Sequence, residues 1–435
     1  MELQDYHSSK NRIKKQQDNL HLKKSSILGL FFVILWLVPT IRWRFQAGSF
    51  SFALLEPFVL LITIILFIAR NKIKLSINLF TIFLLAFIAW LIAIRPWGPD
   101  FEHGLSDIRD WIIPIFAFIV LYSTVKHGWR TWALISIGVG ILQAGLGIFQ
   151  VFTNGFRPFV SSNSVYKLDF LSNVPPSFSV GFFEHPNSLA VFLCVAMIVL
   201  VGWIAESRRT MRFGLVVLFV FFSLALYWTY AKAEILSLIL MIFFFNLIFI
   251  IKSSRLFLIL GLFAFISVFV VGWFAINQWP YEFGSIWWRI NLWQSALQTF
   301  TAYPGILLWG NGDVLFAANS IWPQPHNILF DALIKYGVIG LLIQLILFSL
   351  IIYLGINSYE RGDFKKSLLL RAIWVSLIGF LFAGIVESSF LSIETRMLFL
   401  LLSACFLGFR REIEQVEQSK PSPVVAGNET YGGLG

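Results

Sequence analysis

The chain has 435 residues, of which 58% are hydrophobic and 13% are charged. A soluble domain carries roughly 25% charged residues, so the composition excludes an ordinary soluble enzyme. The net charge of +10 does not indicate a nucleic-acid partner, because the basic residues cluster between hydrophobic segments, where they set orientation. The two cysteines, Cys194 and Cys405, lie in apolar runs and indicate neither a disulfide framework nor a metal site.

Hydropathy predicts an all-α polytopic transmembrane helical bundle with about twelve spans between residues 27 and 411. A basic cytoplasmic tail, 1–26, precedes it, and the absence of a small-residue cleavage site predicts a retained first helix. The polar segment 412–435 is expected to be a disordered cytoplasmic tail. The predicted spans cover residues 27–41, 51–69, 77–94, 111–125, 131–153, 187–205, 213–230, 233–250, 256–275, 327–353, 370–391 and 394–409.

Basic residues favour one set of alternate loops, which predicts that these loops and both termini are cytoplasmic. The other side carries two long outer loops, 154–186 and 276–326, and the second is rich in Trp. In this second loop, residues 287–293 predict a short amphipathic helix, and residues 303–305 and 310–312 predict turns. The ionisable residues near the spans cluster at their outer ends, as expected for an enzyme working at one membrane face rather than for a transporter.

The stretch Pro325-His326-Asn327 separates a polar loop from a long apolar helix. The first N–H groups of that helix lack partners and carry partial positive charge, so an imidazole is held beside an anion site. From the residues alone, a surface histidine capping a membrane helix is the more ordinary interpretation.

Four further sites carry candidate residues, each with an ordinary structural interpretation beside the functional one. Lys232, in a short outer turn, either reaches to the membrane surface or binds an anion. Arg289 lies four residues before Trp293, where a cation stacked on a ring is the ordinary interpretation. The other two are the 185–187 segment, where His185 and Asn187 flank a proline at a helix start, and Arg109, for which an ion pair with its neighbour Asp110 is the default.

Together these segments resemble the O-antigen ligase and O-antigen polymerase superfamily. The resemblance covers most of the chain and rests on the hydropathy layout, the two outer loops and the motifs at 181–190, 229–234, 289–312 and 325–340. Two departures are Lys335, at a position that is often acidic in relatives, and Lys232, where relatives usually carry arginine. The matching residues of the central motif are His326, Asn327, Leu329, Leu333, Gly337 and Gly340.

The resemblance implies a glycosyltransferase-C type fold in a bacterial inner membrane and a reaction of surface-polysaccharide or lipopolysaccharide biosynthesis. A glycan would move from a polyprenyl-pyrophosphate carrier to an acceptor hydroxyl, either on another lipid-linked glycan or on a lipid core, with inversion and without a metal or cofactor. His326 would act as the base, while Arg289 and Lys232 would hold the pyrophosphate. Asn327, His185, Asn187 and Arg109 are weaker candidates. Two alternatives stay open: a transporter of the same superfamily, related to bicarbonate uptake, and a non-catalytic membrane scaffold.

Overall fold

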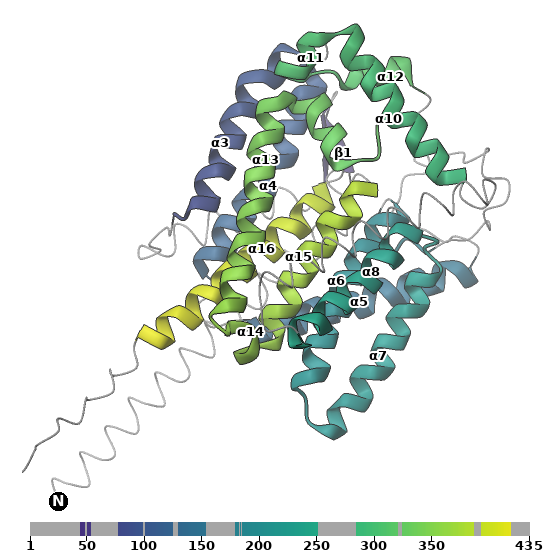
Figure 1. The fold of residues 1–435 in the computed structure, drawn as a ribbon. Coiled ribbons are helices and arrows are strands. Elements are labelled where there is room, and N and C mark those ends of the chain that lie inside the picture. Colours follow the sequence, from purple (N-terminus) through teal and green to yellow (C-terminus); the bar gives the residue numbers. More distant parts are fainter. Residues whose placement is uncertain are drawn as a thin grey trace, which may run out of the picture.

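The computed structural model describes residues 44–47, 50–53, 77–98, 101–124, 129–153, 179–181, 183, 185–250, 284–320, 324–386 and 393–418. These residues form a helical bundle with one short antiparallel strand pair, β1 (Arg44–Ala47) and β2 (Phe50–Ala53) (Figure 1). The helices are α3 (Leu79–Ile94), the 3-10 turn η2 (Arg95–Trp97), α4 (Phe101–Thr124), α5 (Trp129–Phe152), α6 (Pro186–Glu206), α7 (Arg209–Tyr227), α8 (Lys232–Ile250), α10 (Gly284–Ala302), α11 (Pro304–Trp309), α12 (Asp313–Asn319), α13 (Ile328–Glu360), α14 (Asp363–Lys366), α15 (Leu368–Val386) and α16 (Ile393–Gln418).

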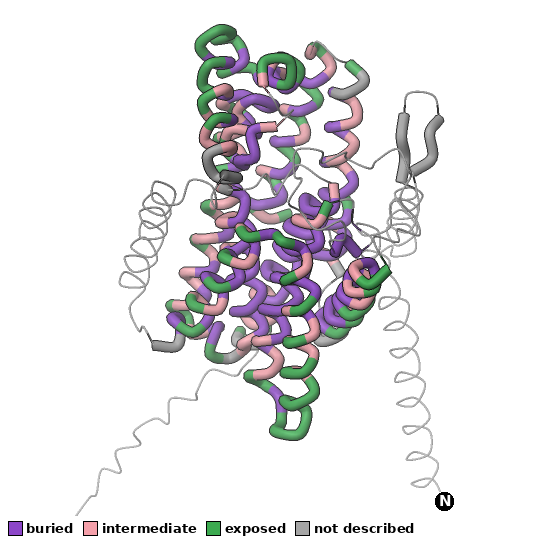
Figure 2. Tube along the Cα trace, turned by 90° about the vertical axis from the view of Figure 1, so that its right-hand side faces the viewer, coloured by how far each residue is buried: buried purple, intermediate pink, exposed green. Residues whose placement is uncertain are grey.

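The helices α6 and α15 form the centre of the bundle. Both are apolar on all sides, and such helices are stable only when other helices surround them. They pack against each other, α6 also contacts α7 and α8, and α15 contacts α8, α13 and α16. Buried residues accordingly line the middle of the bundle, whereas many residues of the peripheral helix α7 are exposed (Figure 2).

The structure confirms an all-α helical membrane protein but not the count of about twelve spans. Within the described residues, six helices are long and apolar enough to cross a membrane: α3, α5, α6, α7, α13 and α15. The predicted spans at 27–41 and 256–275, together with most of 51–69, lie outside the described residues, as do the tail 1–26 and most of loop 154–186. The prediction that residues 51–53 begin a membrane-spanning helix is wrong, because Phe50–Ala53 forms a strand paired with Arg44–Ala47.

Two helices extend well beyond their predicted ends. The α4 helix begins at Phe101, ten residues before the predicted span, so Arg109 lies inside a helix rather than ahead of it. The α16 helix continues to Gln418, although a disordered tail was expected from residue 412. Two ion pairs stabilise this extension: Glu414 pairs with Arg410 one turn earlier at 3.3 Å and with Arg361, at the end of α13, at 2.6 Å.

The Trp-rich outer loop is mainly helical and builds a small second core. The α10 helix has 19 residues, far more than the predicted 287–293, and Pro304 starts α11 instead of forming part of a turn. The turn at 310–312 is confirmed, because it joins α11 to α12. The buried side chains of this core come from α10, α11, α12 and the first part of α13: Leu292, Ala296, Phe300, Ile306, Phe316 and Ile334.

The α13 helix is broken at Gly337, which has a φ of 67° in the left-handed region that favours glycine. A break frees backbone carbonyl groups that would cost free energy if they were buried without donors. Here each one is satisfied: the N–H of Gly312 donates to Ile334 O at 2.9 Å, the N–H of Asn311 to Lys335 O at 3.0 Å, and Trp90 Nε1 to Tyr336 O at 2.8 Å. The sequence Gly310-Asn311-Gly312 therefore holds the break in α13.

Replacing Gly337 with alanine should destabilise the protein. An added Cβ would collide with the carbonyl oxygen of Leu308, and the positive φ disfavours any L side chain. Gly214 on α7 is the matched control, because a Cβ there meets nothing within 4 Å. Gly214→Ala should leave stability unchanged or raise it by up to ~1 kcal/mol. Thermal unfolding of the detergent-purified variants measures both effects, and equal midpoints would contradict the assigned role of Gly337.

Candidate functional site

The head of α13 is built by two adjacent residues with different tasks. Asn327 is the N-cap: its side-chain oxygen accepts the N–H groups of Leu329 at 2.9 Å and Phe330 at 3.1 Å. Its amide Nδ2 donates to the carbonyl oxygen of Ile385 in α15 at 2.7 Å, so Asn327 also fastens this helix head to the bundle. The structure therefore gives Asn327 a clear structural role.

His326 immediately precedes this cap in an unusual backbone conformation. Its φ is 49°, a region that non-glycine residues rarely adopt and that is often found at functional sites. Its side chain is buried, and its ring lies 5.1 Å from the ring of Trp288 on α10, centroid to centroid. Arg289, the predicted phosphate-binding residue of α10, directly follows this tryptophan in the helix.

Lys232 is the first residue of α8 and is exposed. Two hydrogen bonds to α15 show at which end of the bundle it lies relative to His326. Ser237 Oγ of α8 donates to the carbonyl oxygen of Gly379 at 2.6 Å, and Asn327 binds Ile385 one and a half turns further along α15. The turn that carries Lys232 and the head of α13 are therefore at the same end of α15. Within the described residues, no hydrogen bond or ion pair joins Lys232 to His326 or Arg289.

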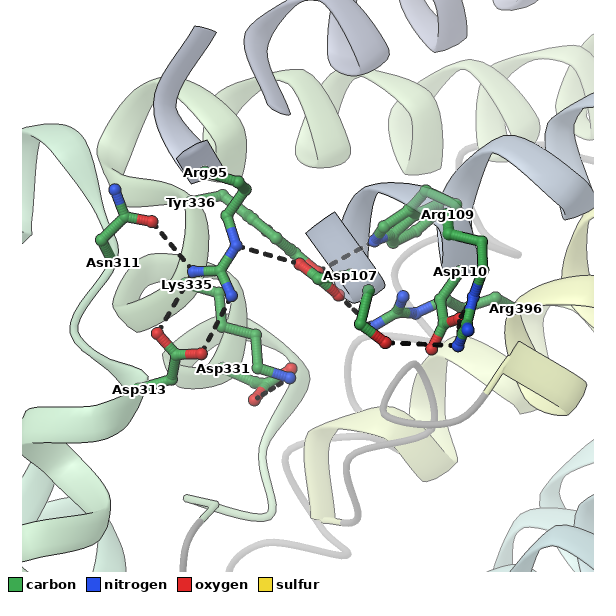
Figure 3. A network of polar contacts seen from close by, with 12 residues as sticks. Arg95, Asp107, Arg109, Asp110, Asn311, Asp313, Asp331, Lys335, Tyr336 and Arg396 are labelled. Atoms are coloured by element: carbon green, nitrogen blue, oxygen red, sulfur yellow. Dashed lines mark hydrogen bonds and ion pairs between the residues drawn. The ribbon is translucent and has the colours of Figure 1, made fainter. Parts of the chain in front are cut away.

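A buried ionic network joins residues of η2, α4, α12, α13 and α16 (Figure 3). The Arg95 guanidinium donates to Asn311 Oδ1 at 2.9 Å and to the two carboxylate oxygens of Asp313 at 3.2 and 2.9 Å. Its Nε lies 3.4 Å from Asp107 Oδ2, and Asp107 Oδ1 in turn accepts from Arg396 at 2.9 Å. Arg95, Asp107 and Arg396 are at most 7% exposed, so these charges are held almost without water.

The network continues into the first part of α13. Trp111 Nε1 donates to the hydroxyl of Tyr336 at 2.9 Å, and that hydroxyl donates to Asp107 at 3.3 Å. Lys335, the residue before Tyr336, forms an ion pair at 3.4 Å with Asp331, one turn earlier on the same helix. The guanidinium carbon of Arg396 also lies 4.8 Å from the centroid of the Trp111 ring. The segment between His326 and the break at Gly337 is thus held by α3, α4 and the 310–313 turn.

The charges in this network balance, which explains how they can be buried together. The cations are Arg95, Lys335 and Arg396, and the anions are Asp107, Asp313 and Asp331. Burying an ionic group is costly unless it has an oppositely charged partner and hydrogen bonds. Each of these six groups has an oppositely charged partner within the network. Lys335 is neutralised by Asp331 on its own helix.

The remaining candidates have structural partners. His185 is the N-cap of α6, with Nδ1 accepting the N–H of Asn187 at 3.3 Å and Pro186 at the first helical position. Arg109 forms the expected ion pair with Asp110 at 2.7 Å on α4, where both side chains are partly buried.

The sequence analysis missed Arg95, Asp107 and Asp313. One signal was available: Arg95 directly follows an apolar run, and Asp313 directly follows the Gly-Asn-Gly turn. Metal-ligating clusters of three or more His, Cys, Asp or Glu residues are absent from the described residues. Comparison of the sequence with protein-family models and with curated proteins finds no match.

Proposed function

We propose that this protein is a membrane glycosyltransferase that moves a glycan from a polyprenyl-pyrophosphate carrier to an acceptor hydroxyl. The observation that carries the proposal is the head of α13, where His326 is held in a left-handed conformation against Trp288, next to Arg289. A base, a cation and a helix N-terminus are the groups that this reaction requires at one place. The proposal includes membership of the O-antigen ligase and polymerase superfamily, with its glycosyltransferase-C type fold.

The chemistry follows from where charge develops in the reaction. As the glycosidic bond breaks, negative charge builds on the pyrophosphate oxygens, and Arg289, Lys232 and the positive end of the α13 helix dipole can stabilise it. The neutral imidazole of His326 takes the proton of the acceptor hydroxyl as its oxygen attacks the anomeric carbon. Attack on the side opposite the pyrophosphate inverts that centre. The acceptor is either a lipid-linked glycan or a lipid core, and no metal step is needed.

The proposed setting is a bacterial inner membrane crossed about twelve times, with both termini in the cytoplasm. Two features support this orientation. The head of α13, the Lys232 turn and the ionic network share one end of the bundle, and the basic residues of the α6–α7 turn and of α14 lie at the other (Figure 1). Positive residues favour the cytoplasmic side, so the site end faces outwards in this proposal.

The test is reconstitution of the purified full chain in liposomes with a fluorescently labelled, lipid-linked glycan. The expected result is a labelled product longer than the donor glycan or joined to an added lipid-core acceptor. Divalent-metal chelation should not reduce this product. An intact donor after incubation with properly folded protein and both acceptor classes would contradict the proposal.

Removing either candidate cation should lower transfer in the same assay. A charge-assisted hydrogen bond contributes about 1.5–3 kcal/mol, so Arg289→Ala and Lys232→Ala should each lose about 10- to 150-fold in rate. Lys232→Arg keeps the charge and should retain activity. The double alanine variant should lose less than the product of the two single losses if both cations hold one pyrophosphate. Independent, multiplicative losses would argue for two separate sites.

One observation favours a second candidate function, a transporter related to bicarbonate uptake. Buried ionic groups within helices of a membrane protein often mark ion pathways, and Arg95, Asp107 and Arg396 form such a group. Uptake of labelled bicarbonate into proteoliposomes that contain the purified full chain would support transport. Glycan transfer without uptake would exclude it.

A further inference from the structure

A cavity opens at the end of the bundle opposite His326. It has a volume of about 520 Å³ and lies between α5, α6, α7 and α15. Its apolar wall consists of Ala133, Trp203, Met211 and Leu369. This volume is within the roughly 300–1,000 Å³ range of small-ligand sites.

The polar residues of the cavity are placed where two membrane-spanning helices end. Both α6 and α7 are long and apolar enough to cross a membrane, and residues 207–208 connect them. Ser207, Arg208 and Thr210 line the cavity beside Trp203, a residue type that favours the level of the lipid headgroups. The cavity therefore presents polar groups at the height of the membrane surface and apolar groups next to the acyl chains.

The charges around the cavity favour an anion. Glu206 also lines it, but its carboxylate oxygen accepts the N–H groups of Leu368 at 2.7 Å and Leu369 at 3.2 Å. The start of α15 thus compensates this negative charge. Arg208 is exposed, and its side chain forms no ion pair with the described residues. Arg212, one turn further, donates from Nε to the carbonyl oxygen of Ser207 at 2.8 Å and adds positive charge nearby.

We propose that this cavity binds one anionic phospholipid. The phosphodiester group contacts Arg208 and Thr210, and an acyl chain follows Trp203 and Met211 into the groove between α6 and α7. The ligand is a lipid rather than a free phosphate, because half of the wall is apolar and the cavity opens at the level of the membrane surface. This site is separate from the proposed transfer reaction and would exist whether or not that reaction is confirmed.

Native mass spectrometry of the full chain in detergent tests the proposal, with phosphatidylglycerol and phosphatidylcholine of identical acyl chains as probes. The wild-type protein should bind the first phosphatidylglycerol about tenfold more tightly than phosphatidylcholine, as expected for one charge-assisted contact. Arg208→Gln should remove that preference. Met211→Asp, at an exposed position in the apolar wall, should weaken binding of both lipids.

Lys365→Gln is the matched control, because Lys365 is an exposed cation at the same end of the bundle but outside the cavity. It should keep the wild-type preference, and glycerol 3-phosphate should not displace the lipid. Equal binding of the two lipids by wild type would overturn the proposal. An equal loss of the phosphatidylglycerol preference in Arg208→Gln and Lys365→Gln would also overturn it. Displacement of the lipid by glycerol 3-phosphate would do the same.

Discussion

Replacing His326 should lower glycan transfer by about 10²–10⁴-fold, the usual contribution of a general base, while the protein still inserts and accumulates. Two variants separate the imidazole from the backbone. His326→Ala removes the side chain but places alanine at a φ of 49°, whereas His326→Asn introduces a residue that tolerates this conformation. If both variants lose the same factor in transfer rate, the loss is due to the missing imidazole and not to a changed backbone. The reconstituted transfer assay gives the rate, and size-exclusion chromatography monitors folding.

His185→Ala is the matched control for this prediction. His185 also precedes a membrane helix, and its Nδ1 accepts the N–H of Asn187 at the N-cap of α6. Removing this cap should cost about 0.5–2 kcal/mol of folding stability, and the transfer rate should be largely retained. A wild-type rate in His326→Asn would remove His326 from the mechanism. A loss in His185→Ala as large as that in His326→Ala would show that the assay reports helix capping instead.

The head of α13 could be predicted from the sequence because its signals are local. A proline, a capping asparagine and an apolar run define a helix start within a few residues, and the structure begins α13 at Ile328 with Asn327 as its cap. The gathering of ionisable residues at one end of the bundle was predictable for a similar reason, since hydropathy locates the ends of spans. Lys232 and Asp331 follow this rule.

The break at Gly337 and the partners of Arg95 could not be predicted, because they depend on distant segments. Apolar periodicity continues through Gly337, and only the 310–312 turn, which supplies donors to the freed carbonyl groups, makes a break stable there. Arg95 meets Asp313 across 218 positions, and Asp107 meets Arg396 across 289. The first pairing brings η2 to α12 and the second requires the packing of α4 against α16, and no local pattern in the sequence encodes either.

The ionic network that results should make Asp107 one of the least replaceable residues of the bundle. Asp107 is 7% exposed and contacts Arg95, Tyr336 and Arg396. Asp107→Asn removes its charge and leaves two guanidinium groups facing each other in a nearly dry region. Breaking a buried ion pair from one side typically costs about 3–5 kcal/mol, and we expect a loss of this size in thermal or denaturant unfolding in detergent.

Asp110→Asn is the matched control, since Asp110 lies on the same helix three residues later. Its carboxylate pairs with Arg109 at 2.7 Å, but their side chains are 25% and 21% exposed, so water screens the pair and the loss should stay within about 1 kcal/mol. Combining Asp107→Asn with Arg396→Gln should cost less than the sum of the single changes, because the second removes a cation that the first leaves unpaired. Equal stabilities of the Asp107→Asn and Asp110→Asn variants would mean that water reaches the network. The network would then no longer explain how the segment between His326 and Gly337 is held in place.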